Sequence, residues 1–90
     1  MKEHLNISVF GRVQGVWFRK YTKDQADLLK IKGFVKNLQD GCVYIEAEAE
    51  KKNLEEFVDW LYTGSPMSKV QDVIWKKGEL QSFKQFEIIR

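Results

Sequence analysis

The chain has 90 residues, 43% of them hydrophobic, with one proline and six glycines, so it fits a single globular domain over residues 1–90 and excludes a disordered or collagen-like polymer. Its formal net charge of +2, with the one histidine neutral, is small for a nucleic-acid binder. One cysteine and one histidine, Cys42 and His4, provide neither an intrachain disulfide nor a zinc site, and we expect no metal and no cofactor.

The first predicted elements are a strand and a helix, joined by a loop with two glycines. Apolar residues alternate over residues 5–10, which is typical of a strand with one buried face. Residues 17–30 have the helical period, with a stripe made of Phe18, Thr22, Ala26 and Leu29. His4 lies before the strand, where we expect a frayed terminus.

A hairpin is predicted next. Gly33 ends the helical region, and residues 34–38 form an apolar run that meets residues 43–49 across Asp40-Gly41, a strong hairpin signal. The alternation in the later strand leaves one face for Cys42, Tyr44, Glu46 and Glu48. We expect that face to be solvated.

A second helix extends to about Tyr62, because Leu54, Phe57, Val58 and Leu61 recur at helical spacing. Its start is open: Asn53 with Glu56 fits a capping pair, and residues 50–52 also fit the helix. Gly64 and Pro66 end it. A strand over 70–75, a polar excursion over 76–79 and a closing strand over 83–89 complete the chain.

The predicted order is therefore βαββαβ, with one possible extra strand. Since strand–helix–strand crossovers are right-handed, both helices lie on one face of a four- to five-stranded, mainly antiparallel sheet. This is an α+β, ferredoxin-like sandwich. Such a fold carries many functions, so the site must decide among them.

The loop over residues 11–19 is the most informative segment. A turn that leads from a strand into a helix presents backbone N–H groups without intrahelical partners, and glycine allows an anion to approach them. Arg19, in the first turn of the helix, adds a guanidinium that can hold two phosphate oxygens. The alternative is a plain tight turn beside a solvated arginine. Walker and dinucleotide-binding patterns are absent.

Asn37 is a second candidate, because its amide can both donate and accept a hydrogen bond and so hold a water molecule in one orientation. The alternative is an asparagine that bonds to the local backbone near a turn. Asp40 and Gly41 are interpreted as turn residues only.

Two segments resemble the signatures of the acylphosphatase family: Gly-Arg-Val-Gln-Gly-Val-Trp-Phe-Arg over 11–19, and Gly-Phe-Val-Lys-Asn-Leu-Gln-Asp-Gly-Cys-Val over 33–43. The likeness covers nearly the whole chain, including Thr22 and Ala26, Phe57, Gly64-Ser65-Pro66, Val70, Val73, and Phe86-Glu87-Ile88.

The resemblance implies an acylphosphate phosphohydrolase that needs no metal. It implies a phosphate-binding loop made of Gln14, Gly15, Val16, Trp17, Phe18 and Arg19, with Arg19 on the phosphoryl group and Asn37 on the attacking water. The substrate is then a small-molecule acyl phosphate, and inorganic phosphate is product and inhibitor. We expect a cytoplasmic monomer with no nucleic-acid or membrane partner, since neither a long apolar run nor a signal-type segment is present.

Two alternatives remain. A non-catalytic anion-binding or regulatory domain would keep the loop without turnover. An RNA-binding module of the same strand order would need exposed aromatic side chains on its central strands, for which only Phe10 and Tyr44 are candidates, while Glu46, Glu48 and Glu50 oppose it.

The chain departs from the family pattern at three positions, all expected to lie away from the site. Lys30 and Ala49 stand where glycine is usual, and Ser65 where proline is frequent. Lys30 should resist a left-handed helix end, so we expect that end to be built differently. Cys42 is interpreted as inert, Trp60 and Trp75 as packing residues, and Trp17 as a packing residue or a wall of the acyl-group pocket.

Overall fold

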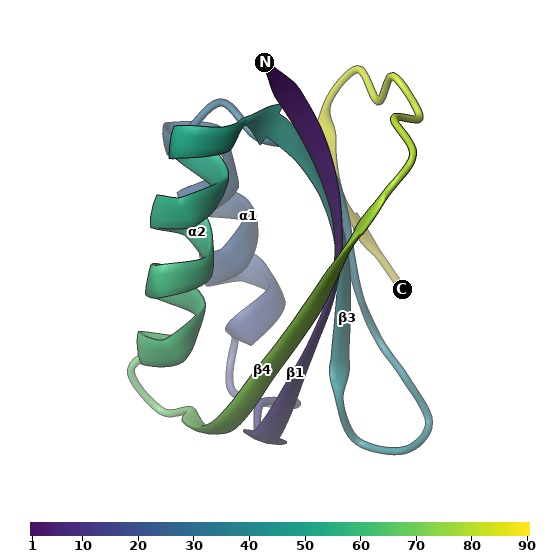
Figure 1. Ribbon diagram of the computed structural model, residues 1–90. Helices are drawn as coiled ribbons and strands as arrows, with labels where there is room; N and C mark the ends of the chain where they lie inside the picture. Colours follow the sequence, from purple (N-terminus) through teal and green to yellow (C-terminus); the bar gives the residue numbers. More distant parts are fainter.

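Two helices cover one face of a five-stranded sheet in the computed structural model, which describes residues 1–90 (Figure 1). The elements are β1 (Lys2–Arg12), α1 (Phe18–Leu28), β2 (Lys32–Asn37), β3 (Val43–Glu50), α2 (Lys51–Thr63), β4 (Lys69–Gly78) and β5 (Phe86–Ile89). The sheet order is β4-β1-β3-β2-β5. Only β2 and β5 are parallel, so the predicted ferredoxin-like, mainly antiparallel sandwich is confirmed.

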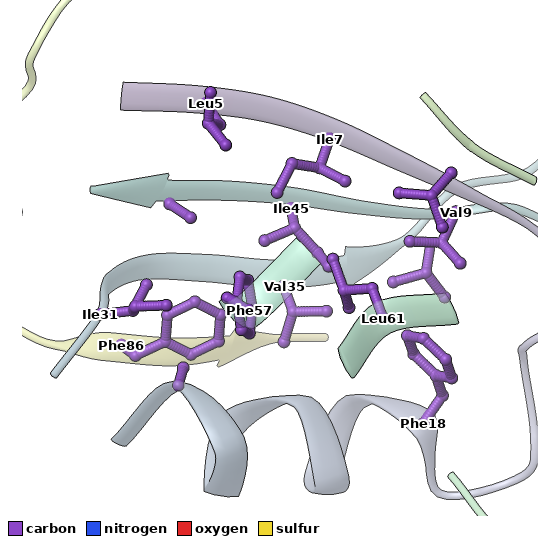
Figure 2. Close-up of a cluster of buried hydrophobic side chains, with 14 of the residues drawn as sticks. Leu5, Ile7, Val9, Phe18, Ile31, Val35, Ile45, Phe57, Leu61 and Phe86 are labelled. Atoms are coloured by element: carbon purple, nitrogen blue, oxygen red, sulfur yellow. The ribbon is translucent and has the colours of Figure 1, made fainter. Parts of the chain in front are cut away.

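The core fills the space between the helices and the inner face of the sheet. Ile7, Val9, Val35 and Ile45 project from the sheet and meet Phe57 and Leu61 of α2, all fully buried (Figure 2). Phe18 points from the first turn of α1 into the same cluster. Because Phe18 also belongs to the loop over residues 11–19, the core holds one end of the candidate site in place.

A sharp bend at the end of β1 sends the chain towards α1. The pairing of β1 with β4 shifts register between Phe10 and Gly11, which marks a β-bulge. Gly11 has φ 127°, and a Cβ there would meet the backbone of β4, 2.8 Å from the nitrogen of Gln71. Only glycine fits this approach, so Gly11 fixes the direction in which the chain leaves the sheet.

The end of α1 corrects one expectation. Lys30 has φ 60° and adopts the left-handed conformation after all. Its N–H donates to Asp27 O (3.3 Å) and that of Ile31 to Ala26 O (2.8 Å), the bond pattern of a Schellman motif. Ile31 and Ala26 are both buried, so their packing imposes the left-handed residue that the lysine disfavours.

The start of α2 also decides between two predictions. The helix begins at Lys51, directly after β3, and Glu50 in extended conformation precedes it without a side-chain cap. The capping pair Asn53–Glu56 is therefore wrong, and the earlier start is confirmed for Lys51 and Lys52, whereas Glu50 ends β3. Burial of Leu54, Phe57 and Leu61 stabilises this helix in place of a cap.

The outer face of β3 is less solvated than predicted, and His4 is not frayed. His4 is 3% exposed and Glu48 is 5% exposed. His4 Nδ1 lies 2.7 Å from a Glu48 carboxylate oxygen. That carboxylate also accepts the N–H groups of Gln81 and Phe83, so the β4–β5 connection folds over this face.

In the C-terminal third, the strand boundaries differ from the predicted ones. Lys76, Lys77 and Gly78 continue β4 rather than forming an excursion, and β5 begins at Phe86 rather than Phe83. Trp60 packs beside Phe18, as predicted, with ring centroids 6.1 Å apart. Trp75 is 47% exposed on edge strand β4 and is only partly a packing residue. Neither helix is long and apolar enough to cross a membrane.

Candidate active site

Free backbone N–H groups line the connection from β1 to α1. The first intrahelical bond at this end runs from Tyr21 N–H to Trp17 O (3.1 Å), and no N–H of residues 15–20 has a hydrogen-bond partner in the protein. Six consecutive donors at a helix N-terminus carry the positive end of the helix dipole. Unpaired N–H groups at a helix N-terminus are suited to bind an anion, which is the role that the sequence predicts for this segment.

Two left-handed residues shape this cradle. Gly15 has φ 73°, and a Cβ added there would have no other atom within 4 Å, so the role of this glycine is conformational rather than steric. Trp17 has φ 62° and ψ 17°, an uncommon conformation for a bulky residue. Left-handed residues within such a turn are typical of a nest, in which successive N–H groups converge on a bound anion.

Arg19 lies beside these donors. Its Nη1 donates to Ile89 O at the end of β5, 3.2 Å away, on the exposed side of the molecule. This bond holds the guanidinium near the cradle, although the two residues are 70 positions apart in the chain. A weakly engaged guanidinium keeps most of its five donors for a ligand.

A cavity of about 400 Å³ brings the candidates together. Gly15, Trp17, Phe18, Arg19 and Asn37 line it. Lys20 and Arg90 add two more cationic side chains, and no Asp or Glu lines the cavity. Lys20 forms an ion pair with Asp24 (2.8 Å), so Arg19 and Arg90 carry most of the unpaired charge. The cavity therefore favours an anion.

Asn37 reaches the cavity from the end of β2. Its Oδ1 is shielded from solvent and has no hydrogen-bond partner in the protein. This excludes the local backbone bond that was the alternative interpretation. A buried, unpaired amide oxygen is an acceptor that an ordered water or a ligand can satisfy, and the residue that carries it lines the cavity.

Gln14 and Val16 do not line the cavity. Gln14 Nε2 donates to the carbonyls of Leu38 (2.8 Å) and Cys42 (2.9 Å), on either side of the β2–β3 turn. Its side chain thus ties the loop to the hairpin that carries Asn37. Val16 is 8% exposed, and its carbonyl accepts a hydrogen bond from Ser65.

Sequence reasoning missed several residues of this region. Val13, Lys20, Ile88 and Arg90 line the cavity, and Ser65 contacts the loop, which corrects the expectation that Ser65 lies away from the site. Val13 lies within the first signature and Lys20 directly follows it, so position alone could have indicated both. Ile88, Arg90 and Ser65 come from distant elements, and no local pattern identifies them.

Cys42 follows the hairpin turn and is 4% exposed. Burial raises the pKa of its thiol to about 11, and the neighbouring Asp40 carboxylate adds to the effect. Asp40 accepts the backbone N–H of Cys42 (3.0 Å), which lowers the pKa of its carboxyl. Asp40 is thus a turn residue, and Cys42 is a protonated, unreactive thiol at neutral pH.

The cradle, the arginine and the small sandwich define a class of domain that other proteins share. The model of the Acylphosphatase family matches residues 5–88. An acylphosphatase of Archaeoglobus fulgidus is 45% identical over 84 residues, which are 93% of this chain and 94% of that protein.

Solved structures agree. The crystal structure of acylphosphatase from Bacillus subtilis superposes with a TM-score of 0.96 and 41% identity over the full length of both chains. An acylphosphatase structure from Coxiella burnetii superposes with a TM-score of 0.95 and is 31% identical, over 98% of this chain and 93% of that one. The chain belongs to the acylphosphatase family.

Proposed function

We propose that this chain hydrolyses the carboxyl–phosphate bond of small acyl phosphates, giving a carboxylate and inorganic phosphate. Family membership supports the reaction class. One observation about the chain itself carries the proposal: five residues with unpaired backbone N–H groups, Arg19 among them, line a single cavity together with Asn37, and no Asp or Glu lines it.

The cradle would bind the phosphoryl group. The phosphoryl oxygens would accept hydrogen bonds from the backbone N–H groups between Gly15 and Lys20 and from the guanidinium of Arg19. Phosphoryl transfer spreads negative charge over the equatorial oxygens in the transition state, and fixed donors in a sheltered cavity stabilise that charge without reorganisation.

Asn37 would hold the nucleophilic water. The water oxygen forms a bond to phosphorus while the bond from phosphorus to the acyl oxygen breaks, and the bonding pair leaves with the carboxylate. A carboxylate needs no general acid to depart. We assign the water proton to a phosphoryl oxygen of the substrate, because no Asp, Glu or His side chain lines the cavity.

Hydrolysis of benzoyl phosphate in chelator-treated buffer, followed by ultraviolet absorbance, tests the activity. Arg19→Gln should lower kcat/KM by about 10²–10³-fold, the range for loss of one transition-state donor, with an unchanged circular dichroism spectrum. Arg12→Gln is the matched control, because Arg12 is exposed at the end of β1, does not line the cavity and loses the same charge. Equal activity in both variants would remove Arg19 from the site.

The water-holding role has its own test. Asn37→Ala should lower kcat by about 10²-fold or more while the inhibition constant of inorganic phosphate changes little. Asn53→Ala, on α2 and away from the cavity, is the control. A parallel loss of kcat and phosphate affinity contradicts the assignment of the water to Asn37.

The second candidate is an anion-binding domain without turnover. The same unpaired N–H groups favour it, because they describe binding and not chemistry. Phosphate binding that depends on Arg19, with no hydrolysis of benzoyl phosphate by the wild type, would establish this candidate instead. A monomeric state and a cytosolic location stay predictions, and light scattering after size-exclusion chromatography measures the first.

A further inference from the structure

A buried hydroxyl contacts the cradle at Val16, a residue that does not line the cavity. Ser65 Oγ donates to the carbonyl oxygen of Val16, 2.9 Å away. Ser65 is 2% exposed and Val16 is 8% exposed, so water does not compete for this bond. Neither residue lines the cavity, and the family signatures do not include Ser65.

The turn that carries Ser65 is itself rigid. The Ser65 carbonyl accepts both the N–H (3.0 Å) and the hydroxyl (2.7 Å) of Ser68. Gly64, with φ 69°, brings the turn against α1, where a Cβ would lie 2.9 Å from a ring carbon of Phe18. Figure 1 shows this α2–β4 connection beside the β1–α1 loop, at the lower end of the molecule. The hydroxyl is thus fixed in space before any ligand binds.

Peptide geometry transmits this contact to the cavity. The carbonyl of Val16 and the N–H of Trp17 belong to one peptide unit, and no peptide bond in the chain is cis. In a trans peptide the C=O and N–H point in opposite directions. Because Ser65 holds the carbonyl on the buried side, the N–H of Trp17 faces the side on which Trp17 lines the cavity.

The bond also opposes an available relaxation. Trp17 has a left-handed backbone that its Cβ disfavours, and rotation of the Val16–Trp17 peptide would relieve part of that strain. Such a rotation would turn the carbonyl dipole towards the anion and the N–H away from it. Rotation would break the bond from Ser65 and leave its buried hydroxyl without this acceptor, which makes the flipped state unfavourable.

We propose that Ser65 is a positioning residue for phosphate binding: it orients the Val16–Trp17 peptide so that the Trp17 N–H donates to the bound phosphoryl group. The use of that N–H rests on the proposed function. The orientation of the peptide is a property of the chain alone, and it is measured without substrate.

Ser65→Ala tests the proposal. The N–H residual dipolar coupling of Trp17, measured by NMR in the weakly aligned protein without ligand, should change, while the couplings of β1 and β3 stay as in the wild type. The dissociation constant of inorganic phosphate, from amide shifts in a titration, should rise about tenfold, as expected for loss of one hydrogen bond to a charged group. The kcat/KM for benzoyl phosphate should fall by a similar factor.

Tyr62→Phe is the matched control. It also deletes a hydroxyl, which donates from the last turn of α2 to a backbone carbonyl, Val73 O at 3.4 Å, and it lies away from the cradle. Urea denaturation of both variants measures how much each substitution lowers the free energy of unfolding. Tyr62→Phe should leave the Trp17 coupling and phosphate affinity unchanged.

The outcomes separate the two proposals. A Ser65→Ala protein that loses stability but keeps the Trp17 coupling and the phosphate affinity of the wild type overturns the positioning role. Phosphate affinity that depends on Ser65, in a wild-type protein without hydrolysis, supports Ser65 and contradicts the proposed function. A wild type that binds no phosphate contradicts both.

Discussion

Single residues in unusual conformations mark where the fold overrides local preference. Lys30 is such a residue, since the Schellman motif at the end of α1 needs the left-handed backbone that lysine disfavours. Lys30→Gly should raise the free energy of unfolding by about 0.5–1 kcal/mol, because relief of the strain exceeds the entropy that glycine adds to the unfolded chain. Urea denaturation measures this.

Lys23→Gly supplies the contrast for that experiment. Lys23 lies within α1, where glycine has no strain to relieve, and the substitution should lower stability by about 1 kcal/mol. If both variants lose stability equally, the left-handed strain at Lys30 is not significant.

Cys42 gives a second prediction at this scale. A thiol with a pKa of about 11 is almost wholly protonated at pH 7.5, and burial also blocks reagents. Iodoacetamide should therefore leave the native protein unmodified for hours and alkylate it rapidly in urea, as read by mass spectrometry. Cys42→Ala should keep full activity, since the contact of Gln14 is to the Cys42 backbone carbonyl.

At the scale of elements, the cradle and the hairpin behave as one unit because Gln14 connects them. Its amide donates to two carbonyls that flank the β2–β3 turn. Gln14→Glu would place an acceptor opposite both carbonyls, whereas Gln14→Leu only removes the donor. We expect Gln14→Glu to lower the free energy of unfolding by about 2 kcal/mol or more at pH 7. This loss should be larger than the loss in Gln14→Leu.

Protonation provides the check on that prediction. A protonated glutamic acid regains one donor, so the difference between the two variants should shrink at pH 4. Denaturation midpoints at both pH values measure it. A difference that does not depend on pH would mean that the side chain at position 14 does not face the two carbonyls in solution.

Periodicity and turn chemistry predict most of the elements. The alternation of β1, the stripe of α1 and Asp40-Gly41 give the first half of the fold, and the signatures give the cradle, Arg19 and Asn37. The failures have a common physical cause. Why His4 is buried and which residue supports Val16 both depend on contacts between distant segments, and no sequence window contains both partners.

At the scale of the whole molecule, Glu48 connects three distant segments. Burial raises the pKa of its carboxyl, but hydrogen bonds from the N–H groups of Gln81 and Phe83 and from His4 outweigh this and hold the pKa below 4.5. A pKa that is lower in the folded state contributes stability above the unfolded value, and this contribution disappears as the pH falls through the folded value.

Glu48→Gln should therefore lower the free energy of unfolding by about 1–3 kcal/mol at pH 7. This difference from the wild type should decline below pH 4.5 as the wild-type carboxyl becomes protonated. Urea denaturation across this range measures the profile. Glu56→Gln, exposed on α2, is the control and should be nearly neutral throughout. A constant cost of Glu48→Gln at all pH values contradicts the role of its charge.

The order of the strands has a kinetic consequence. Only β2 and β3 are neighbours both in the sheet and along the chain, while Lys2 pairs with Glu50, His4 with Gly78, and Gly33 with Phe86. Each of these pairings closes a long loop before it gains any contact, so the search for them limits the folding rate. We expect folding on the millisecond-to-second scale, with the β2–β3 hairpin as the one part of the sheet that can assemble early.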